Sequence, residues 1–139
     1  IRYSVASRGL GDVYKRQVLD FSTMWCGYCQ VAAQEVTSVQ SAYADHDLLY
    51  ITGLVEDSSG AAATVTDCAN WASVFGIIDQ PVLAGSREMQ QSGENGGIEI
   101  TGWPTFIYLT DELVVDTILR GYSAAAIDAG VQRIIPAQE

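Results

Sequence analysis

Positive charge is scarce in this sequence. Of its 139 residues, 7 are Lys or Arg and 17 are Asp or Glu, so the formal net charge is −10 at pH 7. Nucleic acids and anionic lipid surfaces are themselves negatively charged and are repelled by such a protein. We therefore expect no nucleic-acid partner and no binding to an acidic membrane surface.

Long hydrophobic runs are also missing. No apolar stretch approaches the roughly 20 residues that a membrane-spanning helix needs. Hydrophobic residues nevertheless make up 48% of the chain, enough to build a hydrophobic core. A length of 139 residues suits one domain and is too short for two ordinary ones.

The first residues of the chain look foreign to the rest. The segment from Ser7 to Gln17 resembles the in-frame translation of a common DNA-sequencing adapter. We interpret residues 1–17 as a non-native segment without ordered structure and residues 18–139 as the domain. A signal peptide, a lipid anchor or a first β-α unit could then have preceded Val18 in the natural protein. Without residues 1–17, the chain has 3 arginines, no lysine and 16 acidic residues, which gives a formal net charge of −13.

The remaining chain alternates short apolar runs with helical stripes, which are spaced by three or four residues. The order is strand, helix, strand, helix, hairpin and helix. This order predicts an α/β domain in which helices flank a mixed sheet with a parallel part and an antiparallel edge. The expected elements are strands 18–22 and 48–55, an extended piece 81–84, hairpin strands 105–110 and 113–119, and helices 26–44, 64–75 and 123–135, with an exposed excursion at 85–97.

Two cysteines stand at the start of the first expected helix. Cys26 and Cys29 are three positions apart, directly after the first strand. Unpaired N–H groups and the helix dipole favour a thiolate at this place. Cys26 could therefore attack a substrate disulfide, and Cys29, nearly one turn further in, could resolve the mixed disulfide. This chemistry needs neither a cofactor nor a metal.

Two structural roles for the cysteine pair also stay open. A structural zinc site needs four ligands, and only Cys68 and His46 remain as candidates, neither in a paired motif. A structural disulfide across so short a loop would be strained and easily reduced. Cys68 itself shares a helix face with Trp71 and Phe75, which favours a buried thiol over a second reactive one.

A wider set of motifs resembles the thioredoxin superfamily, over residues 18–135. A helix that closes the fold follows the hairpin in that family as it does here. The matching motifs are Asp20-Phe21, Trp25-Cys26-Gly27-Tyr28-Cys29 and Gly102-Trp103-Pro104-Thr105.

The resemblance implies roles for single residues. Pro104 matches a cis-proline that lies beside the dithiol and offers substrates a backbone edge, although it could also be an ordinary trans proline at a strand start. Asp20 matches a buried acid that assists proton transfer from the second cysteine, or it merely forms hydrogen bonds near the strand end. Trp25 matches the aromatic residue that flanks the attacking thiol. Trp103 departs from the family pattern and either faces substrate or packs over the dithiol.

The spacing points to one branch of the superfamily. From Cys26 to Pro104 is 78 residues, longer than in plain thioredoxins. The added material resembles the TlpA-like and redoxin branch of extracytoplasmic bacterial oxidoreductases. That branch implies a periplasmic, secreted or lipid-anchored protein, protein thiols and disulfides as substrates, and a membrane thiol reductase as electron partner. We expect a monomer.

The dipeptide Gly27-Tyr28 resembles that of bacterial disulfide isomerases. Because no proline stands between the cysteines, one more N–H is free to stabilise the Cys26 thiolate. We therefore expect the dithiol–disulfide pair to have a more oxidising redox potential than that of thioredoxin.

Two alternative functions remain. A peroxiredoxin-like peroxidase would need a proline where Leu19 stands, although Thr23 meets the other requirement of that motif. A non-catalytic module could keep the fold and grip extended peptides beside Pro104. Glu56, which ends the second strand near the dithiol, is either a plain loop acid or a helper in proton transfer.

Overall fold

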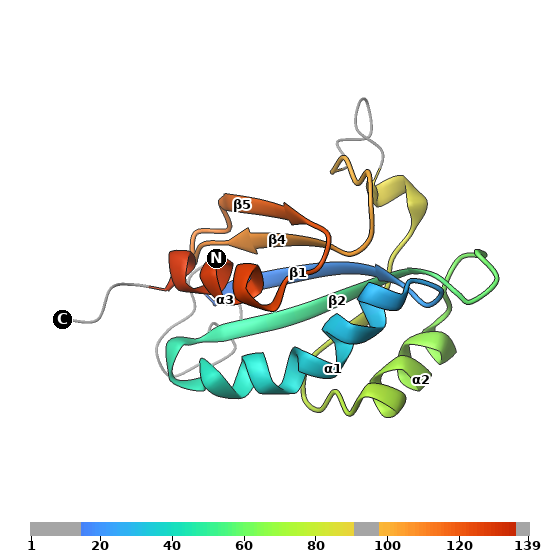
Figure 1. Cartoon of the computed structure of the whole chain (residues 1–139), viewed down its shortest axis with the longest axis horizontal. Coiled ribbons are helices and arrows are strands. Elements are labelled where there is room, and N and C mark those ends of the chain that lie inside the picture. Colours follow the sequence, from blue (N-terminus) through green and yellow to red (C-terminus); the bar gives the residue numbers. More distant parts are fainter. Residues whose placement is uncertain (1–14, 91–97, 136–139) are drawn as a thin grey trace, which may run out of the picture.

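A computed structural model describes residues 15–90 and 98–135. Five strands form one sheet in the order β3-β2-β1-β4-β5 (Figure 1). The strands are β1 (Arg16–Thr23), β2 (Leu48–Glu56), β3 (Val82–Ala84), β4 (Thr105–Leu109) and β5 (Val115–Arg120). The helices are α1 (Gly27–Ala42), α2 (Val65–Phe75) and α3 (Ala124–Ile134), with 3-10 turns η3 (Ala44–His46) and η4 (Arg87–Gln90).

The sheet is mixed, as the order of elements predicted. The central strand β1 runs parallel to β2 and antiparallel to β4. On the outside, β3 pairs parallel with β2 and β5 pairs antiparallel with β4. Each strand of the predicted hairpin and the extended piece at 81–84 therefore has a place in the sheet.

The central strand starts two residues before Val18. Arg16 and Gln17, which the sequence assigned to the adapter-like segment, pair with β2, and the Arg16 guanidinium donates to Asp111 at 3.1 Å. Residues 1–14 of that segment and residues 91–97 of the predicted excursion lie outside the described residues.

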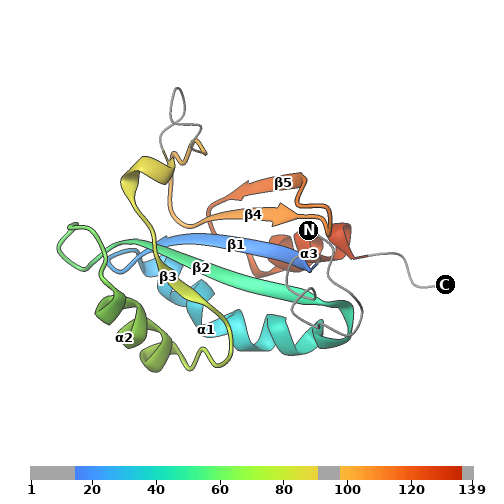
Figure 2. The same cartoon turned by 180° about the vertical axis from the view of Figure 1, so that it is seen from behind.

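All three helices lie on one face of the sheet, in front of it in Figure 1 and behind it in Figure 2. Alternate side chains of the strands point to this face, because successive residues of a strand project to opposite sides. The main core joins sheet and helices. Its fully buried members include Val18, Tyr50, Leu54, Phe106, Tyr108, Cys29, Val36 and Val131.

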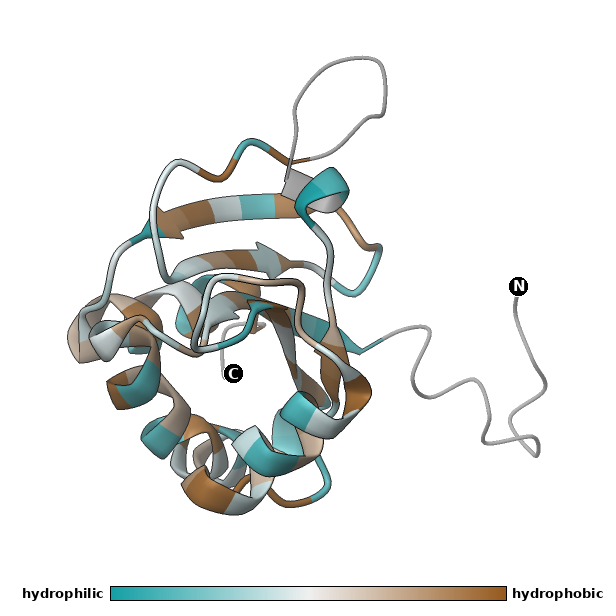
Figure 3. Cartoon of the chain, turned by 90° about the vertical axis from the view of Figure 1, so that its right-hand side faces the viewer, coloured by the Kyte–Doolittle hydropathy of each residue, from teal (hydrophilic) through white to brown (hydrophobic). Residues whose placement is uncertain are grey.

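The opposite face of the sheet carries none of the three helices α1, α2 and α3. A smaller cluster of Phe21, Val55 and Ile107 lies there, covered by Ile100 and Trp103 from the segment before β4. In the figure that colours the chain by hydropathy, seen from the end at which β1 stops, each helix shows both apolar and polar residues (Figure 3). This pattern fits helices that pack on the sheet with one side only.

Candidate active site

The two cysteines lie where β1 turns into α1. Cys26 is the N-cap residue of α1, and its sulfur accepts a hydrogen bond from the backbone N–H of Cys29 at 3.2 Å. Cys26 is 7% exposed and Cys29 is fully buried. Both are free thiols. The first thiol therefore faces the helix N-terminus, and the second lies beneath it.

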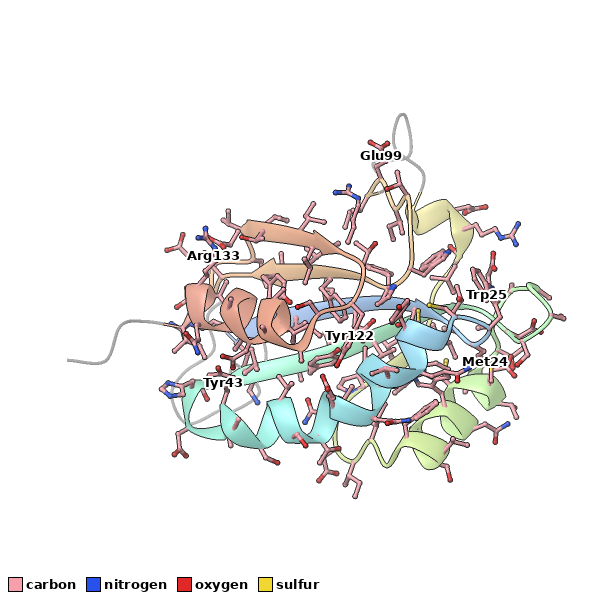
Figure 4. All side chains as sticks on the ribbon, viewed as in Figure 1. Met24, Trp25, Tyr43, Glu99, Tyr122 and Arg133 are labelled. Atoms are coloured by element: carbon pink, nitrogen blue, oxygen red, sulfur yellow. The ribbon has the colours of Figure 1, made fainter. Side chains whose placement is uncertain are left out.

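The polypeptide around Cys26 presents aromatic side chains to solvent. Trp25 and Tyr28 are exposed, and Gly27 is open on its surface side. The ring of Tyr28 stacks on that of Tyr122, with centroids 6.3 Å apart. The Tyr122 hydroxyl donates to Glu35 at 2.6 Å, and this hydrogen bond raises the pKa of Tyr122 to about 12. Figure 4 shows Tyr122 between α3 and α1, away from Trp25.

The chain returns to the same end of the sheet at Trp103 and Pro104. Phe21 pairs with Thr105, so Pro104 lies just beyond this ladder, beside the end of β1. The peptide bond between Trp103 and Pro104 is cis. Pro104 is buried, and its carbonyl accepts a hydrogen bond from Gly121. Trp103 packs against both apolar clusters. A large part of its ring therefore belongs to the hydrophobic core.

Asp20 lies on β1, the strand that leads to the dithiol, and is 1% exposed. Its two carboxylate oxygens accept hydrogen bonds from the hydroxyls of Ser22 and Tyr50, each at 2.6 Å. Burial raises the pKa of Asp20 to about 6, although both hydrogen bonds lower it. A carboxyl group with this pKa exchanges a proton near neutral pH.

Burial also raises the pKa of the Cys29 thiol, and the hydrogen bond with Cys26 raises it further. Cys29 therefore holds its proton in the reduced protein, while Cys26 lies at the helix N-terminus. This difference between the two thiols is the one that sequential attack and resolution require.

Glu56 occupies a position that differs from a plain loop acid. It is only 8% exposed, and its carboxylate accepts the indole N–H of Trp25 at 2.7 Å. The other carboxylate oxygen pairs with Arg87 at 2.5 Å, and Arg87 also donates to the carbonyl of Gly60. Glu56 therefore ties the tryptophan beside Cys26 to the segment after β3. The interpretation of Glu56 as a plain loop acid was wrong, because β2 runs one residue further than predicted, to Glu56 itself.

Solved structures match the fold of this chain over most of their length. The neighbours include a thioredoxin-family thiol:disulfide interchange protein from Chlorobium tepidum, 23% identical, with a TM-score of 0.68 over 95% of this chain and 85% of that one. A DsbF homologue from Corynebacterium diphtheriae is 18% identical, with a TM-score of 0.67 over 86% and 71% of the two chains. A secreted Mycobacterium tuberculosis disulfide oxidoreductase homologous to E. coli DsbE is 18% identical, with a TM-score of 0.60 over 86% and 81%.

The chain has the thioredoxin-like fold. No protein-family model and no curated protein matches the sequence. The thioredoxin-like fold confirms the α/β architecture that the sequence predicted, and it brings residues from β1, α1 and the segment before β4 to one end of the sheet.

Several residues of this thioredoxin-like site were not singled out from the sequence. Ser22 could have been found, because alternate residues of a strand share a face and it stands two positions after Asp20. Tyr50, Arg87 and Tyr122 come from distant parts of the chain, and no local pattern links them to the cysteines. Cys68 is buried, as predicted, and burial raises its pKa.

Within residues 15–90 and 98–135, no group of three or more His, Cys, Asp or Glu side chains is arranged to hold a metal ion. No helix of this described part has the length and apolarity needed to cross a membrane.

Proposed function

We propose that this protein is a thiol–disulfide oxidoreductase that exchanges disulfides with protein substrates through Cys26 and Cys29. One observation carries the proposal: a capping thiol at the start of α1 accepts a hydrogen bond from the residue that bears a fully buried second thiol, and the strand that leads into this helix holds a buried acid. The solved neighbours that share the fold are named as thiol:disulfide interchange proteins and disulfide oxidoreductases, which supports the same chemistry.

The reaction proceeds in two exchanges. The Cys26 thiolate attacks one sulfur of a substrate disulfide, and the other substrate sulfur leaves as a thiolate. Cys29 then loses its proton and attacks Cys26, which releases the second substrate sulfur and leaves a Cys26–Cys29 disulfide. Asp20, with its raised pKa, accepts the proton of Cys29. Run backward, the same steps oxidise a substrate dithiol.

The substrate lies across the aromatic surface around Cys26. Trp25, Gly27 and Tyr28 border the attacking sulfur, and Trp103 and Pro104 offer a backbone edge from the other side. An extended segment on either side of a substrate cysteine fits such a border, because peptide groups can pair with an exposed backbone edge. The protein acts as an extracytoplasmic monomer, and a membrane thiol reductase returns electrons to it.

Insulin reduction by dithiothreitol tests the activity. The wild-type protein should accelerate precipitation of the insulin B chain, and Cys26→Ser should abolish the acceleration. Cys29→Ser should instead accumulate a mixed disulfide that non-reducing gels detect. Equal rates for wild type and Cys26→Ser would point to the binding module that only grips peptides.

The redox potential tests the part played by Gly27 and Tyr28. The Cys29 N–H already donates to the Cys26 sulfur, and the N–H of Tyr28, which a proline at this position would lack, is one more donor that can stabilise a thiolate there relative to the disulfide. Equilibration in glutathione buffers should give a redox potential for Cys26 and Cys29 that is more oxidising than that of thioredoxin. A potential at or below about −270 mV would contradict this expectation.

A further inference from the structure

Two aromatic rings meet beside the dithiol. Tyr28 stands between the cysteines and is 66% exposed. Its ring stacks on that of Tyr122, from the loop between β5 and α3, with an angle of 17° between the ring planes. Tyr122 follows Gly121, whose N–H donates to the Pro104 carbonyl at 2.8 Å. The ring pair therefore joins the segment between the cysteines to the segment at the cis-proline.

A carboxylate lies at one end of this ring pair. The Tyr122 hydroxyl donates to Glu35 of α1 at 2.6 Å, where α3 and α1 approach each other (Figure 4). The hydrogen bond raises the pKa of Tyr122 to about 12, so the hydroxyl keeps its proton at neutral pH. The three side chains of Tyr28, Tyr122 and Glu35 together carry the negative charge of one carboxylate. Tyr122 and Glu35 are partly exposed, so a ligand from solvent can contact them.

The four arginines that the structure describes have other partners. Ion pairs join Arg16 with Asp111, Arg87 with Glu56 and Arg133 with Asp116, and Arg120 donates to the carbonyl of Glu99. Glu35 instead accepts a neutral hydroxyl. None of these arginines therefore neutralises the charge of Glu35.

A cation bound at these rings is stabilised in two ways. The face of an aromatic ring is the negative part of its quadrupole and attracts a cation within about 6 Å of its centroid. A carboxylate beside the rings adds a direct attraction between opposite charges. The planar guanidinium of arginine also stacks on aromatic faces, which the compact ammonium of lysine cannot do. The arrangement therefore favours a basic side chain, and arginine above lysine.

We propose that Tyr28, Tyr122 and Glu35 bind an arginine or lysine side chain that lies next to the reactive cysteine of a protein substrate. The inference rests on the proposed function, because it concerns the substrate of the same dithiol. Tyr28 is two positions from Cys26. An extended chain advances only about 3.3 Å per residue, so the side chain at the rings belongs to a close neighbour of the cysteine that Cys26 attacks.

Two disulfide-linked peptide dimers of the same composition test this preference. One carries arginine on both sides of its cysteine, and the other carries the same arginines six positions away. Their net charges are equal, so long-range attraction to the acidic protein is the same for both. A self-quenched fluorophore reports the second-order rate constant of reduction by the reduced protein.

Arginine beside a disulfide can also change its intrinsic reactivity. The ratio of the two rate constants is therefore divided by the same ratio measured with dithiothreitol. We expect this corrected ratio to favour the peptide with neighbouring arginine at least about threefold for the wild type.

Glu35→Gln and Tyr28→Leu should each lower the corrected ratio toward one. Glu35→Gln removes the charge and keeps an acceptor for Tyr122, and Tyr28 lies at the surface, so neither change disturbs the core. Changes in the reactivity of Cys26 cancel in the ratio, because both peptides meet the same thiol. Asp45→Asn is the matched control. It removes one negative charge from η3, which follows the far end of α1, and should keep the wild-type ratio.

A corrected ratio near one for the wild type would overturn the proposal, as would a raised ratio that both variants keep. A third peptide with norleucine beside the cysteine should gain no advantage. A preference for norleucine equal to that for arginine would show that the rings bind apolar side chains and would overturn the basic substrate class. These outcomes leave the proposed function standing, since the peptides are reduced. If the wild type reduces none of the peptides, the proposed function fails, and this proposal fails with it.

Discussion

At the scale of single residues, burial decides which groups change charge. Asp20 is 1% exposed, and burial outweighs two hydrogen bonds to raise its pKa to about 6. Its ordinary pKa in an unfolded chain is 3.8. The folded protein therefore binds this proton more tightly than the unfolded chain does. Ionised Asp20 lowers the free energy of unfolding above pH 6, and the penalty disappears as the pH falls toward 4.

Asp20→Asn should therefore stabilise the protein at pH 8. We expect an increase in the free energy of unfolding of up to about 3 kcal/mol, which shrinks to near zero at pH 4. Urea unfolding of the reduced wild type and variant at both pH values measures this difference in the free energy of unfolding. Asp57→Asn is the control, since hydrogen bonds lower the pKa of Asp57 and its neutral replacement should not stabilise at either pH. The same gain at pH 4 and pH 8 would contradict the linkage.

Glu56 is a second residue whose surroundings define its role. Its carboxylate joins the Trp25 indole and Arg87, so we expect it to position the tryptophan beside the attacking thiol. Glu56→Ala removes the acceptor of the indole N–H and should cost about 0.5–1.5 kcal/mol of stability. It should also expose the Trp25 indole N–H to faster hydrogen exchange, measured by NMR.

Two variants serve as controls for this effect. Glu56→Gln keeps an acceptor oxygen, and Arg87→Ala keeps the bond to the indole, so both should retain slow exchange at Trp25. Unchanged exchange in Glu56→Ala would show that the hydrogen bond does not hold the ring.

At the scale of elements, the contact between α3 and the sheet depends on a glycine, which has no side chain. Gly130 is buried, and a Cβ added there would lie 2.4 Å from the ring of Tyr108. Helix propensity alone would favour alanine by about 1 kcal/mol. The clash is with a fully buried ring in the core, which has little room to move.

Gly130→Ala should therefore destabilise the protein, by about 1–3 kcal/mol. Gly27→Ala is the matched control, because a Cβ at the start of α1 meets nothing within 4 Å and should not lower stability. Thermal unfolding of the reduced variants compares the two. Equal midpoints for both variants would mean that α3 can shift away from Tyr108 without cost.

At the scale of the whole molecule, net charge governs which substrates approach. The formal charge of −10 attracts basic protein segments and repels acidic ones, and salt screens both effects. We expect kcat/KM for a disulfide peptide rich in Lys to fall several-fold between 20 and 200 mM salt. The value for a matched peptide rich in Glu should rise over the same range. An identical salt dependence for both peptides would contradict charge steering.

The sequence by itself determined the order of elements and the place of the dithiol. Apolar periodicity, the helix start at Cys26 and the turn between two hairpin strands are local patterns, and the structure has a helix or strand in each of these places. The same local patterns predicted the mixed sheet and the burial of Cys68, because both follow from element order and helix faces.

Only the tertiary structure decided which side chains meet at the site. The parallel register of β1 and β2 brings Tyr50 to Asp20 across 30 positions of sequence, and it sets Glu56 against Trp25 across 31. A shift of one residue in that register would turn these side chains to the opposite face. Contacts of this kind depend on how strands pair and helices pack, and no motif around Cys26 and Cys29 contains that information.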